Sequence, residues 1–193
     1  MKRAVLVSIQ PCWCELIVNG EKTIEVRKTR PKLKTPFKCY IYCTMDHPYI
    51  SVSCGKLDKF NYRTNTVGRC NGKVIGEFVC DGIVWLARVG FTRRGGEPEY
   101  RIANNGDWES PIGRLLEEAC LTEEEIDAYL GGNPGFGWHI SDLKIYSQPV
   151  DITNFHSCLG CEYVGDCDTY CWDPVQIPPQ SWRYVEENEG VLG

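Results

Sequence analysis

The protein has 193 residues and a mass of 22.0 kDa, and 42% of its residues are apolar and 24% charged. These proportions are typical of soluble globular proteins and exclude long disordered regions, so we expect one compact domain with a small appendage. No run approaches the ~20 consecutive apolar residues that a membrane-spanning helix needs. The early apolar stretch from Ala4 to Ile9 ends at Gln10 and Pro11. We therefore expect neither a membrane span nor a secretory signal, and predict a cytoplasmic protein.

The net charge of −5 is unevenly distributed along the chain. Residues 1–60 hold 11 Lys/Arg against 5 Asp/Glu, whereas residues 61–193 hold 10 against 21. A basic stretch from Lys22 to Lys38 has Glu25 as its only acid. This stretch could contact a phosphate backbone or another anion, or it could be a solvated basic face. A pI near 5.3 argues against nonspecific coating of DNA.

The first elements follow from apolar spacing. The early apolar stretch predicts a buried strand, and a helix is expected to begin at Pro11 and end near Gly20. The segment Thr23 to Arg27 alternates, which predicts a half-buried strand with Glu25 and Arg27 on one face.

The middle of the chain predicts two strands separated by an insertion. Phe37 to Cys43 alternates as a strand, whose cysteines are expected to pack as small apolar groups. Residues 45–72 lack periodicity and predict an irregular insertion. Val74 to Leu86 predicts one long or bent strand, with Gly76 and Gly82 as candidate bulge points.

Two helices and a strand are expected next. Ser110 opens the first predicted helix, and a capping box of Thr122 and Glu125 opens a second helix over Glu123 to Leu130. Phe136 to Tyr146 then alternates as a strand. This order without a regular βαβ repeat predicts an α+β fold, namely a small mixed sheet or open barrel with helices packed outside it.

A change of composition after residue 152 predicts a domain of residues 1–152 and a Cys-rich tail of residues 153–193. The tail holds four of the twelve cysteines in the spacing C-x2-C-x5-C-x3-C, which favours one tetrahedral zinc ion in a structural site. His156 could replace one ligand, and an iron–sulfur cluster or two disulfides are alternatives. The predicted zinc ligands are Cys158, Cys161, Cys167 and Cys171.

Several segments resemble the ASCH domain of the PUA-like superfamily in its bacterial and phage type. The first is G-x-K-x-x-E-x-R, made by Gly20, Lys22, Glu25 and Arg27 after a strand and a short helix. Two further segments are similar to later parts of that domain, namely LTEEEIDAYLGGNPGFGWHISDLKIY over residues 121–146 and PPQSW over residues 178–182. The resemblance covers most of residues 4–150 except the insertion.

This resemblance implies a PUA-like barrel whose cleft, near the first helix and second strand, contacts RNA or a nucleotide. One branch of the family hydrolyses an amide of 4-acetylcytidine with a lysine, a threonine three residues later and a glutamate. Lys22 matches the lysine, but Glu25 stands at the threonine position. Glu117 and Glu118 are the candidates for the glutamate.

Three functions are therefore carried forward. The first is binding of RNA or a nucleotide-like ligand, with Arg27, Lys28 and Arg30 as contacts. The second is a hydrolase that acts on acetylated cytidine or cleaves RNA, with Lys22 and Glu25 as catalytic groups. The third is an adaptor that binds protein through its acidic half. A structural network of the same charged residues is the alternative to any cleft.

Aromatic residues could stack on unpaired bases. Trp13 and Trp138 are the candidates, although each lies in a pattern that also fits the core. His139, on the opposite strand face from Trp138, could act as an acid or base or be a structural histidine.

Overall fold

The computed structural model of the chain describes residues 2–53, 56–59, 69–90, 98–104, 107–158 and 172–188. These residues form two five-stranded sheets, two two-stranded sheets, three α-helices and one 3-10 turn. The predicted α+β class is therefore confirmed. Among the described residues, no helix is long and apolar enough to cross a membrane.

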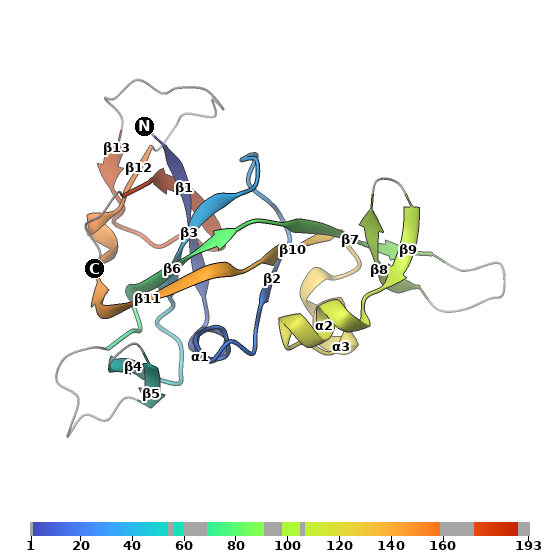
Figure 1. Cartoon of the computed structure of the whole chain (residues 1–193), viewed down its shortest axis with the longest axis horizontal. Helices are drawn as coiled ribbons and strands as arrows, with labels where there is room; N and C mark the ends of the chain where they lie inside the picture. The colour runs from blue at the N-terminus through green and yellow to red at the C-terminus, as the bar shows by residue number, and fades with distance from the viewer. Residues whose placement is uncertain are drawn as a thin grey trace.

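The first sheet has the order β11–β6–β3–β1–β14 (Figure 1). β1 runs parallel to β3, and the other neighbours are antiparallel. β1 is buried on both faces, because helix α1 (Pro11–Val18) contributes to the core on one face and the C-terminal segment packs on the other. The strands of this sheet are β11 (Ser141–Val150), β6 (Lys73–Cys80), β3 (Phe37–Cys43), β1 (Arg3–Ile9) and β14 (Trp182–Glu186).

The second sheet has the order β2–β10–β7–β8–β9. Helices α2 (Gly113–Ala119) and α3 (Glu123–Leu130) lie side by side against it (Figure 1). A Cβ at Gly137 would meet Val84, Ile24 and Leu115 at 2.9–3.2 Å, so a glycine lets the helices and strands approach closely. The strands are β2 (Ile24–Arg27), β10 (Gly135–His139), β7 (Ile83–Val89), β8 (Glu99–Asn104) and β9 (Asp107–Pro111).

Two expected single strands are each divided between the two sheets. The prediction of one strand over residues 74–86 is wrong, because the chain leaves the first sheet after β6 and enters the second as β7. The prediction over residues 136–146 is wrong in the same way, since β10 and β11 belong to different sheets. The two crossings lie together, where the His139 amide donates to the Gly82 carbonyl at 2.9 Å. The apolar alternation continues through both breaks, which hides them in the sequence.

A bulge beside Gly76 is confirmed. The register of β3 against β6 shifts between Ile41, which faces Gly76, and Tyr42, which faces Val74. A Cβ at Gly76 would lie 2.5 Å from the Lys144 carbonyl oxygen of β11. Glycine therefore allows the neighbouring strand to pass.

The first of the two helices, α2, begins later than its sequence predicts. Ser110 and Pro111 lie in β9, and α2 begins at Gly113 instead. The predicted capping box of α3 is confirmed, because Thr122 and Glu125 exchange hydrogen bonds of 2.8 and 3.2 Å. The capping box therefore locates the start of a helix more reliably than a Ser-Pro pair.

The insertion at residues 45–72 is not irregular throughout. It contains a hairpin of β4 (Ile50–Ser53) and β5 (Lys56–Lys59). The buried side chain of Asn71 holds its base, because it accepts a hydrogen bond from the Ile50 amide and donates to the carbonyls of Asp46 and Pro48. The hairpin lies at the lower left in Figure 1, where β4 packs against β11 and Ile50 is buried in the core of the first sheet.

The C-terminal segment returns to the first sheet. After the 3-10 turn η1 (Ile152–Asn154), β12 (His156–Cys158) pairs with β13 (Trp172–Pro174). β14 then pairs antiparallel with β1. The segment predicted as a tail thus supplies an edge strand of the main sheet.

Candidate ligand-binding site

The residues of the G-x-K-x-x-E-x-R motif come together because a short turn joins α1 to β2. Gly20 has φ +75°, a left-handed conformation that ends α1, and the amide of Lys22 donates to the Leu16 carbonyl. Lys22 therefore lies directly before β2. Glu25 and Arg27 follow on one face of that strand, as its alternation predicts.

Lys22, Glu25 and Arg27 form a buried charged triad. The Lys22 ammonium donates to the Ala119 carbonyl at 2.7 Å and lies 3.5 Å from a Glu25 carboxylate oxygen. The other Glu25 oxygen pairs with Arg27 at 2.9 Å, and Arg27 also donates to the Ser8 carbonyl. One carboxylate thus bridges two cations.

All four residues of β2 are buried, so the prediction of a half-buried strand is wrong. Ile24 and Val26 face α2 and α3, while the opposite face looks into the core between the two sheets. Buried charges must be paired with opposite charges, and the Glu25 carboxylate pairs with both Lys22 and Arg27. The Arg27 Nε has no hydrogen-bond partner in the described structure.

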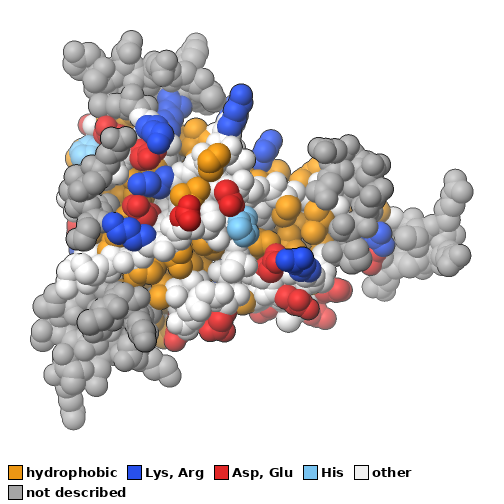
Figure 2. Space-filling model, in the orientation of Figure 1, with side chains coloured by type: hydrophobic (Ala, Val, Ile, Leu, Met, Phe, Trp, Pro, Cys, Tyr) orange, Lys and Arg blue, Asp and Glu red, His pale blue; other side chains and the backbone are white. Residues whose placement is uncertain are grey.

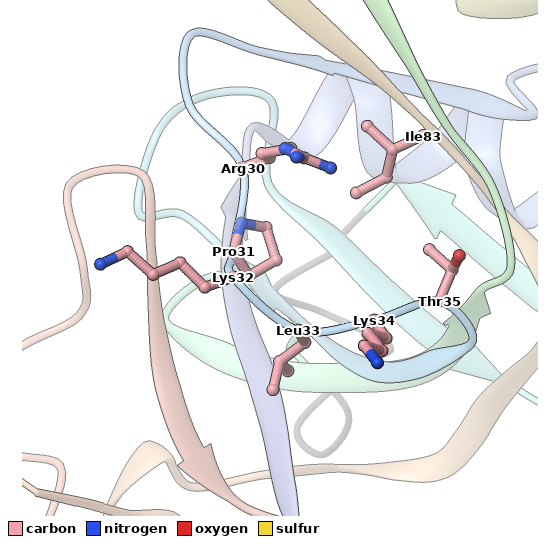
Figure 3. A pocket seen from close by; sticks show the side chains of 7 residues that line it. All are labelled: Arg30, Pro31, Lys32, Leu33, Lys34, Thr35 and Ile83. Carbon is pink, nitrogen blue, oxygen red and sulfur yellow. The ribbon is translucent and has the colours of Figure 1, made fainter. Parts of the chain in front are cut away.

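A basic loop, residues 28–36, follows the triad and joins β2 to β3. It exposes Lys28, Arg30, Lys32 and Lys34, and it contains no acidic residue. Residues 30–35 of this loop and Ile83 of β7 line a pocket of about 450 Å³. In Figure 3, Arg30 extends toward Ile83, whereas Lys32 extends away on the other side of the loop.

The C-terminal strand β14 fixes this loop. The Trp182 indole donates to the Thr29 hydroxyl at 2.9 Å, and the Lys32 amide donates to the Tyr184 hydroxyl at 2.7 Å. These contacts join residues about 150 positions apart in sequence. The pocket is therefore formed by a loop with a defined position.

Two cations of the loop lie over aromatic rings. The Lys28 ammonium is 5.1 Å from the centre of the Tyr129 ring, and the Arg30 guanidinium is 5.8 Å from that of Phe136. Burial raises the pKa of the Tyr129 hydroxyl, although Arg27 beside it acts in the opposite direction. Tyr129 and Phe136 were not identified from the sequence, because each fits a core position in its element.

The two predicted stacking residues occupy different positions. Trp138 is fully buried between Phe37 and Trp182, so it is a core residue in this structure. Trp13 is half-buried, and its ring lies 5.1 Å from the Lys22 ammonium. Of the two roles expected for Trp138, its burial fits the core residue and not the stacking residue.

The remaining titratable candidates lie outside the triad. His139 is half-exposed and shares a hydrogen bond of 2.6 Å with Asp81, which lowers the pKa of that carboxyl. Glu117 is exposed, and the Glu118 carboxylate pairs with Arg114 at 3.0 Å. The Glu118 backbone carbonyl accepts from the Thr23 amide, so this helix end supports the motif through its backbone.

The predicted zinc ligands lie outside the described residues. The backbone of Cys158 belongs to β12, whereas its side chain and Cys161, Cys167 and Cys171 fall in the part that is not described. Within the described ranges, no group of three or more His, Cys, Asp or Glu could hold a metal ion. The zinc site stays a prediction.

No family model matches the sequence, and a search of curated proteins finds no match. Solved structures do match in fold. An ASCH protein from Zymomonas mobilis is 17% identical, with a TM-score of 0.51 over 95% of this chain and 88% of that chain. Two single-substitution variants of the same protein are 16% and 18% identical, have TM-scores of 0.50 and 0.53, and match over 95% of this chain and 91% and 89% of theirs. The predicted fold of an ASCH domain is therefore confirmed.

Proposed function

We propose that this protein binds single-stranded RNA or a nucleotide-like ligand at the basic loop. One observation carries the proposal, namely that Arg30 and Lys34 line a pocket of about 450 Å³. Guanidinium and ammonium groups are the usual partners of phosphate oxygens. The pocket volume falls within the ~300–1,000 Å³ of small-molecule sites, which suits one nucleotide unit.

The distribution of charge restricts where a phosphate could bind. Asp and Glu side chains gather along the lower edge of the face shown in Figure 2, and others are interspersed with Lys and Arg across its middle and left, whereas Lys and Arg stand at its upper edge. The protein as a whole carries a net charge of −5. Phosphates are therefore repelled by much of the molecule and attracted to the basic loop.

The test is the salt dependence of binding to a labelled single-stranded RNA octamer. We expect Arg30→Ala with Lys34→Ala to reduce the slope of log K against log salt by about 1.4, since each lost contact to a single strand removes about 0.7. Lys2→Ala with Arg114→Ala removes the same charge elsewhere and should leave the slope unchanged. An affinity that ignores ionic strength would contradict the phosphate contacts, and no affinity for any oligonucleotide would direct attention to the adaptor hypothesis.

Hydrolysis of an amide on a modified nucleoside is the second candidate. The observation that favours it is the buried Lys22 ammonium, 3.5 Å from Glu25. If the lysine must release its proton during catalysis, Lys22→Arg should abolish turnover of 4-acetylcytidine, because arginine keeps its proton. If Lys22 is only a fixed cation, Lys22→Arg should retain ligand binding. The carbonyl, carboxylate and indole contacts of Lys22 are those of a fixed cation, which supports binding over catalysis.

We also propose that Cys158, Cys161, Cys167 and Cys171 bind one structural zinc ion. Four thiolates are a donor set suited to tetrahedral zinc, and a reducing cytoplasm would keep them reduced. Elemental analysis should find about one zinc per chain, and a chelator should loosen this segment while the sheets persist. Metal-free protein with all four thiols reactive would contradict this proposal.

A further inference from the structure

We propose that two aromatic side chains beside the pocket form a stacking surface for the unpaired bases of a single strand. They are Phe136 of β10 and Trp85 of β7, and together we name them the aromatic row. This inference rests on the proposed function, because it adds contacts with the bases to the phosphate contacts of the same site.

The row is continuous because of the strand register. Phe136 lies directly opposite Arg27 of β2 on one side and Trp85 of β7 on the other. Directly opposed residues share one face of a sheet, with Cβ atoms about 4.5–5.5 Å apart. Tyr129 belongs to α3, which packs on the other face of this sheet, so it is not part of the row. Phe136 and Trp85 therefore lie side by side on one face of the sheet.

Trp85 presents part of its ring to solvent. It is 42% exposed, which makes it one of the more exposed large hydrophobic residues of the described structure. Phe136 beside it is half-buried and packs against the core. Exposed aromatic surface adjoining a cationic pocket is the combination found in single-strand binding sites.

A cation connects the row with the pocket. Arg30 lies over Phe136 and also lines the pocket. A single strand offers the matching combination of a flat base and a nearby phosphate.

The spacing also connects the row to the pocket. Ile83 lines the pocket, and Trp85 follows two residues later on the same face of β7, which is about 7 Å along a strand. A nucleotide in the pocket thus places its neighbour near Trp85. Base pairing hides both faces of a base within the stack of a duplex, so the row selects an unpaired strand.

The experiment compares three labelled probes: a single-stranded RNA octamer, the same octamer in a duplex, and an octamer of abasic ribose phosphates. We expect Trp85→Ala to weaken binding of the single strand about 5- to 150-fold, since base stacking on an aromatic ring contributes about 1–3 kcal/mol. Binding of the abasic probe and its salt dependence should stay unchanged. Trp85→Phe should retain most of the affinity, while Trp85→Leu, which keeps apolar bulk, should lose it.

Ile177→Ala is the control, because Ile177 is 72% exposed and lies between β13 and β14. It should bind all probes as the unchanged protein does. Equal binding of the single strand by Trp85→Ala and the unchanged protein would overturn the inference and leave the proposed function intact. Equal affinity of the unchanged protein for the single-stranded and abasic probes would also overturn it, without depending on the stability of any variant. Failure of the unchanged protein to bind every probe would overturn the proposed function itself.

Discussion

The buried triad and the basic loop are neighbours in sequence but opposite in environment. Lys22, Glu25 and Arg27 are 3–7% exposed, and each is paired with another charge or a backbone carbonyl. Lys28 and Arg30 are exposed and lie over aromatic rings. The motif therefore marks the charges that join α1, β2 and the end of α2, whereas the residues after it are the ones that a ligand can reach.

The difference shows why a charged motif and a binding surface need not coincide. Removing one partner from a buried ion pair leaves an unpaired charge in a medium that solvates it poorly. The stability of the fold therefore depends on the triad. Exposed cations cost little to change and interact with whatever approaches. The triad should thus control stability, and the loop should control binding.

The largest expected effect is on stability. Arg27→Ala leaves Glu25 with one partner and removes the contact with the Ser8 carbonyl, so we expect the free energy of unfolding to fall by about 3–5 kcal/mol. Urea denaturation measures this change. Arg30→Ala, three residues later and exposed, should change it by no more than about 0.5 kcal/mol. Equal losses in the two variants would remove the distinction between triad and loop.

An intermediate effect is expected where β14 holds the loop. Tyr184→Phe deletes one hydrogen bond to the loop and should cost about 1 kcal/mol. Trp182→Phe deletes the other and also removes ring area that packs against Trp138, so it should cost more. Hydrogen exchange should become faster at residues 29–34 and stay unchanged in α3. Unchanged exchange in the loop would mean that the strand contacts do not determine its position.

The smallest effect concerns the exposed pair of Asp81 and His139. Their hydrogen bond lowers the pKa of Asp81 in the folded protein. A carboxyl with a lowered folded pKa stabilises the protein above its unfolded pKa, and this contribution is lost as the pH falls below about 4. We therefore expect Asp81→Asn to cost less than about 1 kcal/mol at pH 6, and the cost to shrink as the pH falls from about 4 through the lowered pKa of the folded protein. A loss that stays the same as the pH falls would show that the charge of Asp81 is not its source.

Local signals in the sequence predicted much of this structure. The capping box at Thr122, the turn at Gly20 and the alternation that places Glu25 beside Arg27 each depend on residues within one or two turns of chain. Such patterns constrain the backbone directly, so they are visible without the fold. The ASCH resemblance located the motif and anticipated the fold.

Features that depend on distant parts of the chain were missed. The alternation continues through Asp81 and Gly82, so it could not show that β6 and β7 enter different sheets. Trp85 and Phe136 look like core residues in any periodic analysis, and how deeply each is buried depends on elements distant in sequence. The role of Trp182 in holding the loop could not be predicted either, because its partner Thr29 lies 153 residues away in sequence.

The hydrogen bond between Lys32 and Tyr184 also determines when the pocket can be completed on the ribosome. Synthesis at ~5–20 residues per second takes about 8–30 s to cover the 152 residues between these partners. During that interval the nascent chain already holds β1 and the basic loop, but β1 lacks its neighbour β14 and the loop lacks both of its anchors. The cationic residues therefore exist for many seconds before they are fixed around a pocket, and the pocket is complete only after β14 has been synthesised.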